Sequence, residues 1–312
     1  MRARALATFG PLVALLLACI VFSVQSPRFL ATENFALILQ QVMVVGVLAI
    51  GQTLVILTAG IDLSCGLVMA LGAIVMTRLA TVGGWSPAMA ILAGVAVTSA
   101  VGALNGLLVT RVKLPPFIVT LGTMNIAFAV TQLISHSQSI TDVPPMLTWL
   151  GSTVRVGGAP IAYGAILMLL LYLGAWLWLR ETASGRHIYA VGNHREAARL
   201  AGSPTERVLL GVYALAGACY GIAALLSVAR TGAGDPQAGQ TENLDTVTAV
   251  VLGGTSLFGG RGIVLGTLVG ALIVGVFRNG LTLMGVSSVY QILVTGVLVI
   301  ASVALDQWSR RA

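Results

Sequence analysis

The side chains that carry most enzyme chemistry are scarce and scattered in this 312-residue chain. A Walker A nucleotide-binding loop needs Gly-Lys followed by Ser or Thr, whereas the only lysine, Lys113, stands between Val112 and Leu114. The histidines and cysteines form no CxxC motif or mixed cluster with the spacing of a metal site; they are His136, His187, His194, Cys19, Cys65 and Cys219. The sequence therefore predicts no catalytic residue, no metal ligand and no cofactor in this chain.

One acidic residue stands apart from all other charges. The charged neighbours of Asp62 that are nearest in sequence are Glu33 and Arg78. In a bilayer centre a carboxylate costs about 2.5–3.5 kcal/mol on insertion scales, so it must face water, a partner or a helix end. The apolar run around Asp62 is interrupted by Thr58, Gly60, Ser64 and Gly66. Asp62 therefore either belongs to a solute pathway or caps the helix that follows it.

A second interruption of this kind lies in the other half of the chain, at Gly253-Gly254-Thr255-Ser256 and Gly259-Gly260. Paired breaks in apolar segments point to a translocation pathway, and uncharged polar side chains suit the hydroxyl groups of a neutral solute. The candidate pathway residues are Asp62, Ser64, Thr58, Asn105, Thr123, Asn125 and Asn279. Each could instead make an interhelical hydrogen bond, worth about 0.6 kcal/mol.

The composition of the whole chain places these residues in a membrane. Hydrophobic residues make up 57% of the chain and charged residues 9%, and the mean hydropathy is +0.96. Soluble domains carry roughly 25% charged residues, so a water-facing surface could not be built from this sequence. We expect an all-α, polytopic integral membrane protein, with residues 1–312 forming a single transmembrane domain.

Gly/Pro clusters divide the apolar sequence into about ten helices, given that a full span needs about 20 residues. The eighth is too short for a straight span and is expected to be a half-helix. The expected ranges are 6–25, 35–57, 63–81, 88–109, 116–134, 160–179, 208–229, 246–258, 263–283 and 288–305.

The basic residues give these helices an orientation. With both termini in the cytoplasm, the cytoplasmic segments hold twelve basic residues, namely Arg2, Arg4, Arg111, Lys113, Arg180, Arg186, Arg195, Arg199, Arg207, Arg261, Arg310 and Arg311. The outer loops hold three, Arg28, Arg155 and Arg230. This asymmetry is the positive-inside bias, so it explains the net charge of +7 without a nucleic-acid partner.

Residues 180–207 form the longest predicted cytoplasmic segment. Asn193 followed by Glu196 has the spacing of a capping box, and Gly202 suits the position after the last helical turn. The short helix between them is marginal alone and would be stabilised by docking. The segment is therefore either a solvated basic loop or a coupling helix for a partner; the coupling candidates are Gly185, Arg186, Gly192, Asn193, Glu196, Ala197, Ala198, Arg199 and Gly202.

Several longer strings resemble the permease subunits of bacterial ABC importers for ribose and related monosaccharides. They are Gly185–Gly192, Glu196–Gly202, Thr58–Ser64, Asn105-Gly106, Pro116–Gly122, Val250–Gly262 and Arg278–Leu281. The resemblance runs in order over residues 35–306. The chain departs from it at Asn243-Leu244-Asp245, where many members have Glu-Leu-Asp, and at Asn125–Phe128, where many carry an Arg-Gly pair.

The resemblance implies an inner-membrane permease that imports a ribose-like pentose or a hexose. It further implies a separate ATP-binding cassette ATPase at 186–202, a second permease subunit (identical or paralogous) and a periplasmic solute-binding protein. That protein would dock on the outer loops 135–159 and 230–245, which carry Asp142, Arg155, Arg230, Asp235, Glu242 and Asp245.

Two other functions remain open from the sequence. An ion-coupled secondary transporter would use Asp62 as its proton or sodium site, although proton relays usually employ several ionisable groups. An ABC permease could also carry another small solute, such as a branched-chain amino acid.

Overall fold

The computed structural model describes residues 2–311 and is almost entirely helical. Ten long helices correspond to the ten predicted ranges, and six of them are long and apolar enough to cross a membrane. The ten are α1 (Arg2–Gln25), α2 (Thr32–Leu57), α3 (Cys65–Thr81), α4 (Pro87–Thr110), α5 (Pro116–Ser135), α7 (Tyr163–Glu181), α10 (Thr205–Thr231), α11 (Glu242–Leu252), α12 (Val264–Leu283) and α13 (Ser288–Arg311). The all-α polytopic fold is thereby confirmed.

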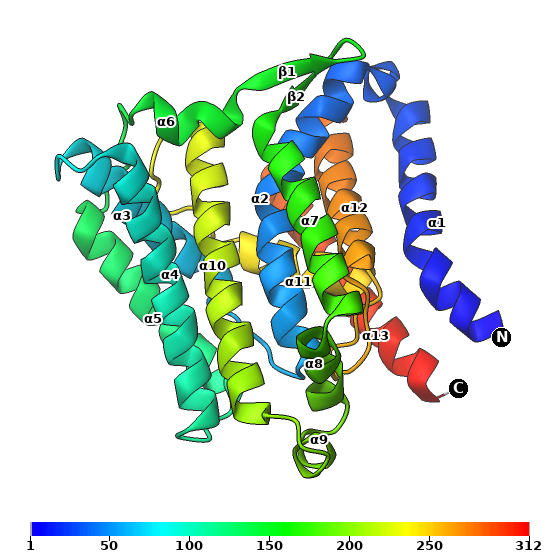
Figure 1. The fold of residues 1–312 in the computed structure, drawn as a ribbon. Coiled ribbons are helices and arrows are strands. Elements are labelled where there is room, and N and C mark those ends of the chain that lie inside the picture. Colours follow the sequence, from blue (N-terminus) through cyan, green and yellow to red (C-terminus); the bar gives the residue numbers. More distant parts are fainter. Residues whose placement is uncertain (1, 312) are drawn as a thin grey trace.

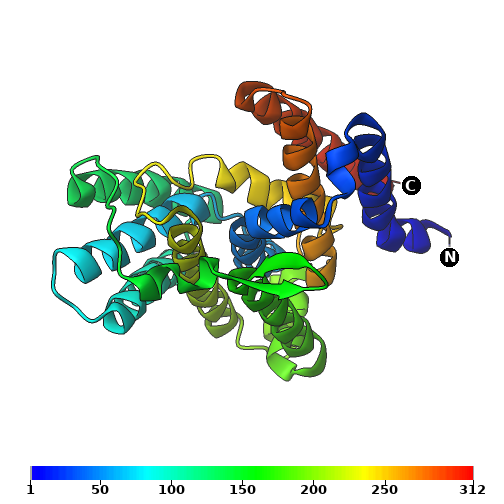
Figure 2. The ribbon, with the colours of Figure 1, turned by 90° about the horizontal axis from the view of Figure 1, so that it is seen from above.

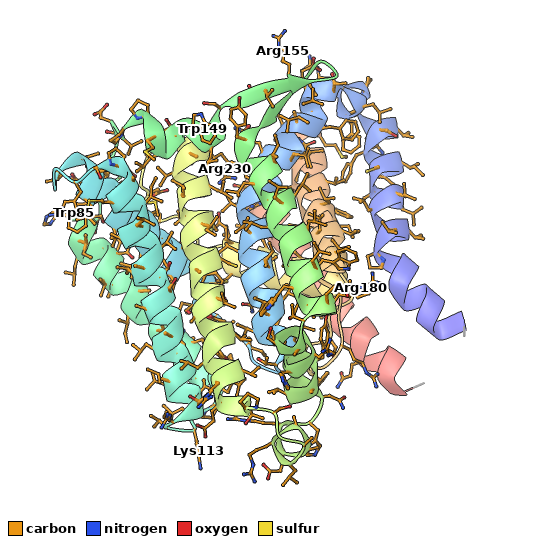
Figure 3. The ribbon with its side chains drawn as sticks, viewed as in Figure 1. Trp85, Lys113, Trp149, Arg155, Arg180 and Arg230 are labelled. Carbon is orange, nitrogen blue, oxygen red and sulfur yellow. The ribbon has the colours of Figure 1, made fainter. Side chains whose placement is uncertain are left out.

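Short elements mark the two ends of the bundle (Figure 1). At one end, the strands β1 (Thr153–Val156) and β2 (Ala159–Ala162) form an antiparallel hairpin, next to α6 (Pro145–Thr148), η2 (Trp149–Gly151) and η1 (Pro27–Leu30). At the other end lie α8 (Ala183–Asn193) and α9 (Arg195–Leu200). We name these the hairpin end and the α9 end. Figure 3 places Arg155 and Trp149 at the first and Lys113 at the second.

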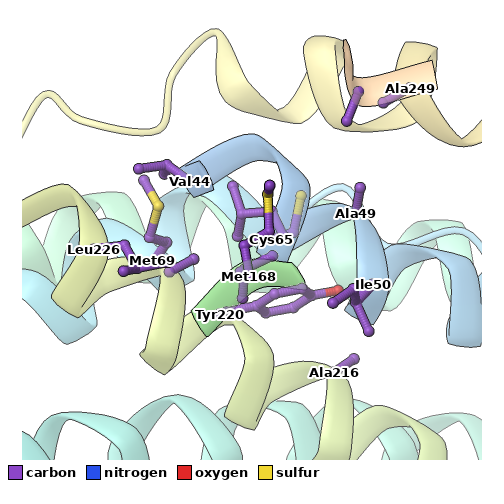
Figure 4. Close-up of a cluster of buried hydrophobic side chains, with 14 of the residues drawn as sticks. Val44, Ala49, Ile50, Cys65, Met69, Met168, Ala216, Tyr220, Leu226 and Ala249 are labelled. Carbon is purple, nitrogen blue, oxygen red and sulfur yellow. The ribbon is translucent and has the colours of Figure 1, made fainter. Parts of the chain in front are cut away.

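Helix α2 forms the centre of the bundle. Every residue from Val42 to Leu57 is buried, because α7, α10, α11 and α12 all pack against this helix (Figure 2). Figure 4 shows part of this core, with Tyr220 of α10 beside Ile50 of α2 and Cys65 close by. A helix that is apolar all round must be covered on all sides, so α2 is the fixed element against which the others are placed.

Glycines allow α4 and α10 to pack backbone to backbone. A Cβ on Gly102 would overlap the carbonyl oxygen of Tyr213, and one on Gly217 would overlap that of Thr98. Close approach through small residues is typical of helices in lipid, where packing rather than water exclusion drives association. The outer faces of α4, α5 and α7 expose large apolar side chains suited to lipid, including Leu92, Leu133 and Leu170.

Helices α3 and α11 are shorter than a full span. The 11 residues of α11 extend about 16 Å at 1.5 Å per residue, roughly half of a 30 Å hydrocarbon core. The predicted range 246–258 was therefore right in length but misplaced: the helix begins four residues earlier, at Glu242, and ends at Leu252. Its end is set by Gly253 and by Gly254, whose φ of 83° favours glycine.

Candidate translocation pathway

The carboxylate of Asp62 lies in a fully buried network just before α3. Its Oδ1 accepts hydrogen bonds from the backbone N–H (2.8 Å) and the hydroxyl (2.6 Å) of Ser64. Its Oδ2 accepts one from the hydroxyl of Tyr220 on α10, at 3.1 Å. The two Ser64 bonds close a local turn just before α3, whose N-cap residue Ser64 makes no side-chain capping bond, and the Tyr220 bond ties this turn to a neighbouring helix. Buried charge is tolerated here because three donors replace water.

Two further helices join this network. The amide of Asn105 on α4 donates to the hydroxyl oxygen of Ser64 at 3.3 Å, and Thr123 of α5 donates to Asn105 at 2.6 Å. Thr120 of α5 accepts from the N–H of Leu63 and donates to the carbonyl of Ile61. The irregular segment 58–64 is therefore fixed by side chains from α4, α5 and α10, as backbone without regular bonds must be in a membrane.

The structure brings four of the seven predicted pathway residues together and separates the other three. Asp62, Ser64, Asn105 and Thr123 share the buried network. Thr58 donates to the Val55 carbonyl in its own helix, and Asn125 donates to Leu121 on an exposed face. Asn279 of α12 donates to Asn34 at 2.9 Å, beside the hairpin end of α2. A role in solute passage stays a prediction for all seven.

The N-termini of the half-helix α11 and of α3 meet inside the protein. The side-chain oxygen of Asn243 accepts from the N–H of Gly66 at 2.6 Å and from the thiol of Cys65 at 3.1 Å. A Cβ on Gly66 or on Gly239 would overlap the other's carbonyl oxygen, so the backbones touch. We call this contact the α3–α11 junction. Asn243 supplies this acceptor without a charge.

A cavity of about 250 Å³ lies toward the hairpin end, and residues of α2, α10, α12 and α13 line it. Arg278 of α12 lines it and pairs with the carboxylate of Asp245 on α11 at 2.9 Å. The full lining is Gln41, Val42, Val45, Arg230, Ala271, Val274, Gly275, Arg278, Thr282 and Gln291. Sequence reasoning missed this site because its polar groups are dispersed over four helices, although Arg230 and Arg278 were visible as charges beside apolar segments.

Two predictions for this region were wrong. Arg230 was expected in an outer loop, but it belongs to the last turn of α10 and lines the cavity. Residues 230–245 were expected to form one outer loop, but Gly239 touches Gly66 inside the protein, and Asp245 is buried in α11. The segment folds inward because a half-helix leaves room above its N-terminus.

Helix α8 contacts both interruptions at the α9 end. The carbonyl of Leu57 accepts from the N–H of Gly260 at 3.0 Å, and a Cβ on Gly192 would overlap that same carbonyl. Tyr189 of α8 donates to the Gly262 carbonyl at 3.1 Å, and partial burial raises its pKa. One helix thus holds the end of α2 and the 253–262 loop together.

The N-cap of α9 differs from the one predicted, and the helix α8 that precedes it was not predicted. Asn193 is the last residue of α8, and it is His194 that caps α9 by accepting from the N–H of Ala197 at 3.1 Å. Glu196 instead pairs with Arg199 at 2.5 Å, and this hydrogen bond lowers the pKa of the exposed Glu196 carboxyl. Gly202, with φ of 85°, ends the motif as predicted.

The remaining coupling candidates divide between buried contacts and the surface. Gly185 and Gly192 are buried against Leu179 and Leu57, and Ala198 is buried, whereas Arg186 and Ala197 are exposed. Hence α8 supplies the contact with the membrane core, while α9 presents most of its side chains outward. Within the part of the chain that the structure describes, no group of three or more His, Cys, Asp or Glu residues could hold a metal.

Comparison with known proteins places this arrangement in a family. The family described as branched-chain amino acid transport system / permease component matches residues 34–303. The chain belongs to this permease family. The permease is 45% identical to the fructose import permease protein of Rhizobium meliloti, over 96% of this chain and 85% of that protein.

Two other similar proteins are also sugar permeases by name. The permease is 39% identical to the ribose import permease protein of Bacillus subtilis, over 96% of this chain and 92% of the relative. It is 35% identical to the D-allose transport system permease protein of Escherichia coli, over 96% and 91%. No solved structure matches the permease at a significant level. These near-full-length matches favour a sugar ABC importer permease over an ion-coupled transporter.

Proposed function

We propose that this protein is the membrane-spanning subunit of an ABC importer that brings a monosaccharide into the bacterial cytoplasm. The observation that carries the proposal is the similarity over nearly the whole chain to import permeases for fructose, ribose and allose. The α9 end would face the cytoplasm, since Lys113 and most basic residues of the helix connections lie there. Both termini would then be cytoplasmic as well.

A separate ATPase subunit would drive the permease through α8 and α9. Helix α9 exposes Glu196, Ala197 and Arg199 to a partner, whereas α8 holds Leu57 and Gly260 through Gly192. A displacement of α8 would therefore move the end of α2 and the 253–262 loop together. These segments lead to the Asp62 network and to α11, so ATP-driven closure of the ATPase would reach the middle of the membrane.

The hairpin end would receive the sugar from a periplasmic binding protein. Exposed Asp142 and Arg155 lie in the 135–159 region there, and a partner of complementary charge could dock on them. A second permease subunit, either a copy of this chain or a paralogue, would complete the membrane part of the importer.

The function is tested by uptake of D-fructose and D-ribose into liposomes that contain the permease, its ATPase and its binding protein. We expect uptake of one of these sugars to require ATP on the side of the membrane where the ATPase is bound. Uptake should persist without a proton or sodium gradient. Uptake that follows an ion gradient without ATPase, and that is lost in Asp62→Asn, would establish the secondary-transporter alternative. Uptake of a branched-chain amino acid instead would contradict the sugar assignment.

The coupling role has its own matched pair of variants. Gly192→Val forces a side chain into the Leu57 carbonyl, whereas Gly211→Val adds the same side chain to α10 where nothing lies within 4 Å of the Cβ. We expect Gly192→Val to lose nearly all sugar uptake and Gly211→Val to keep it. Replacement of 192–202 by a Gly/Ser linker should also abolish uptake. Undiminished uptake in the linker variant would refute the coupling assignment.

A further inference from the structure

The cavity toward the hairpin end is linked through one lining residue to the half-helix α11. Its first turn carries Asp245, whose carboxylate is 2.9 Å from the Arg278 guanidinium in the cavity wall. The Asp245–Arg278 pair thus connects the cavity wall to the first turn of α11, and the residues that line the cavity come from α2, α10, α12 and α13. Broken helices that end near the middle of the membrane form the solute sites of many transporters. Here the space lies on the side from which an imported solute would arrive.

The lining combines hydrogen-bonding groups with an apolar wall. Two guanidinium groups (Arg230 and Arg278), two carboxamides (Gln41 and Gln291) and the hydroxyl of Thr282 face a wall that includes Val42, Val45 and Val274. The amide nitrogen of Gln291 already donates to Thr282 and to the Val286 carbonyl, and the Thr282 hydroxyl donates to the Arg278 carbonyl. The Gln291 and Thr282 oxygens therefore remain as acceptors, and Gln41 and the guanidinium groups supply the donors. A ligand with both donors and acceptors matches such a set, and an apolar face on that ligand would match the valines.

The positive and negative charges around the cavity balance, which disfavours a charged ligand of either sign. Arg278 is paired with Asp245, and Arg230 interacts electrostatically with Glu242 of the same helix turn. Two cations are thus opposed by two carboxylates. A neutral polyol could bond both guanidinium groups without removing either from its counter-charge. The volume of about 250 Å³ lies just below the roughly 300–1,000 Å³ of pockets for drug-sized ligands, as suits a small solute.

We propose that this cavity is the outward-facing site at which the permease receives a monosaccharide through hydroxyl contacts to Gln41, Arg230, Arg278, Thr282 and Gln291. The inference rests on the proposed import function and adds the residues that would accept the sugar from the binding protein. Beneath the site, the first turn of α11 is joined to α3 through Asn243. The sugar would therefore stand above the α3–α11 junction until the ATPase cycle opens a way past it.

The test uses Gln41, because its side chain is exposed and its replacement strips no buried partner. Gln41→Trp fills the mouth of the cavity, and Gln41→Ala removes one carboxamide. Leu37→Trp and Leu37→Ala are the matched controls, since Leu37 lies one turn nearer the hairpin end of α2, is half exposed and does not line the cavity. All four would be measured with the complete transporter in liposomes, with whichever of D-fructose and D-ribose the unaltered system imports.

The deciding quantity is the number of sugar molecules imported per ATP hydrolysed. We expect Gln41→Trp to lower this ratio about tenfold and Gln41→Ala about threefold, in keeping with the loss of one hydrogen bond. ATP hydrolysis stimulated by the binding protein should remain within about twofold of normal, because the coupling contacts are intact, and both Leu37 variants should resemble the unaltered protein.

Three results separate the possible failures. An unchanged ratio in Gln41→Trp would overturn the cavity assignment, as would a parallel loss of uptake and ATP hydrolysis, which would indicate a structural defect. Absence of ATP-dependent sugar uptake in the unaltered system would instead refute the proposed function itself.

Discussion

Two polar regions lie on either side of the α3–α11 junction, and they differ in where their hydrogen bonds go. The Asp62 network directs its bonds inward: Ser64 and Tyr220 supply three donors to one carboxylate, and Asn105 and Thr123 continue the chain of bonds. In the cavity toward the hairpin end, polar side chains of four helices line a space of about 250 Å³, although Arg278, Thr282 and Gln291 also bond to other protein groups. Both contain charged groups at membrane depth, yet only the second has room for a solute.

This difference shows that polar residues in membrane helices can have two different roles, to stabilise the fold or to contact a solute. In the Asp62 network, the bonds fix an irregular stretch of backbone that would otherwise leave unsatisfied groups in lipid. In the cavity, polar groups that include the Gln41 carboxamide and the Gln291 oxygen line a space that can hold a small molecule. The network should therefore govern the stability of the protein, and the cavity its transport. The following predictions test that division, in order of decreasing effect.

The largest effect is expected at the junction between the two regions. Asn243→Cys, in a chain with Cys19 and Cys219 replaced by alanine, places a thiol opposite the native Cys65, whose sulfur is 3.1 Å from the present Asn243 side chain. Oxidation should link α3 to α11 and abolish sugar uptake, because a joined α11 could not open a route past its N-terminus. Reduction should restore uptake.

The control for this crosslink is the same variant with Cys65→Ser, in which oxidant should have no effect on uptake. Formation of the disulfide would be verified by the mass of the peptides that contain it. A fully crosslinked permease that still imports sugar at the normal rate would show that the junction is a static contact, and the sugar would then have to pass elsewhere.

A large loss of stability is expected when the network loses its centre. Asp62→Ala leaves the donors of Ser64 and Tyr220 without an acceptor in a fully buried site, so the free energy of unfolding should fall by about 3–5 kcal/mol. Asp62→Asn keeps one acceptor oxygen for Ser64, so the free energy of unfolding should fall less in this variant. Thermal unfolding in detergent measures both. Equal stability of Asp62→Ala and the unaltered protein would contradict a structural role.

The sequence predicted most helix positions but not the start of α11. Helix positions followed from the spacing of apolar residues and Gly/Pro breaks, and the two interruptions near Asp62 and Gly253 were located correctly. The start of α11 was misplaced because 242–245 is a polar stretch, Glu-Asn-Leu-Asp, and polar sequence normally indicates a loop. Only the tertiary pairing of Asp245 with Arg278 and of Asn243 with Gly66 explains a helix there.

The candidate site was harder to predict for a related reason. Asp62 and Ser64 are two positions apart, so a local hydrogen bond between them could be foreseen. The structure shows this bond with Tyr220 added, but the bond precedes α3 and does not cap it. The cavity toward the hairpin end joins Gln41, Arg230, Arg278 and Gln291, which are separated by up to 250 positions in the chain. No local spacing relates these residues. Their proximity follows from how α2, α10, α12 and α13 pack around the space above a half-helix.

A smaller loss of stability is expected when one hydroxyl of the network is removed. Tyr220→Phe leaves the Asp62 Oδ2 without its donor, and a hydrogen bond to a charged group contributes about 1.5–3 kcal/mol. Tyr213 on the same helix offers a matched control, because its buried hydroxyl has no hydrogen-bond partner among the described residues. Tyr213→Phe should therefore leave the free energy of unfolding unchanged or raise it. A loss of equal size in both variants would contradict the assigned bond.

The smallest effect is expected at the edge of the network, where Thr123 donates to Asn105 at 2.6 Å. Thr123→Val keeps the shape of the side chain and removes one interhelical hydrogen bond, which in membrane proteins averages about 0.6 kcal/mol. Thr131→Val on the same helix is the control, since the Thr131 hydroxyl donates only to Ala127 in its own helix. If Thr123→Val destabilises the protein by several times this amount while Thr131→Val does not, the bonds from Thr123 through Asn105 and Ser64 to Asp62 reinforce one another. The Asp62 network would then unfold as a unit. Substitutions at the cavity mouth should leave the free energy of unfolding unchanged and alter sugar import alone.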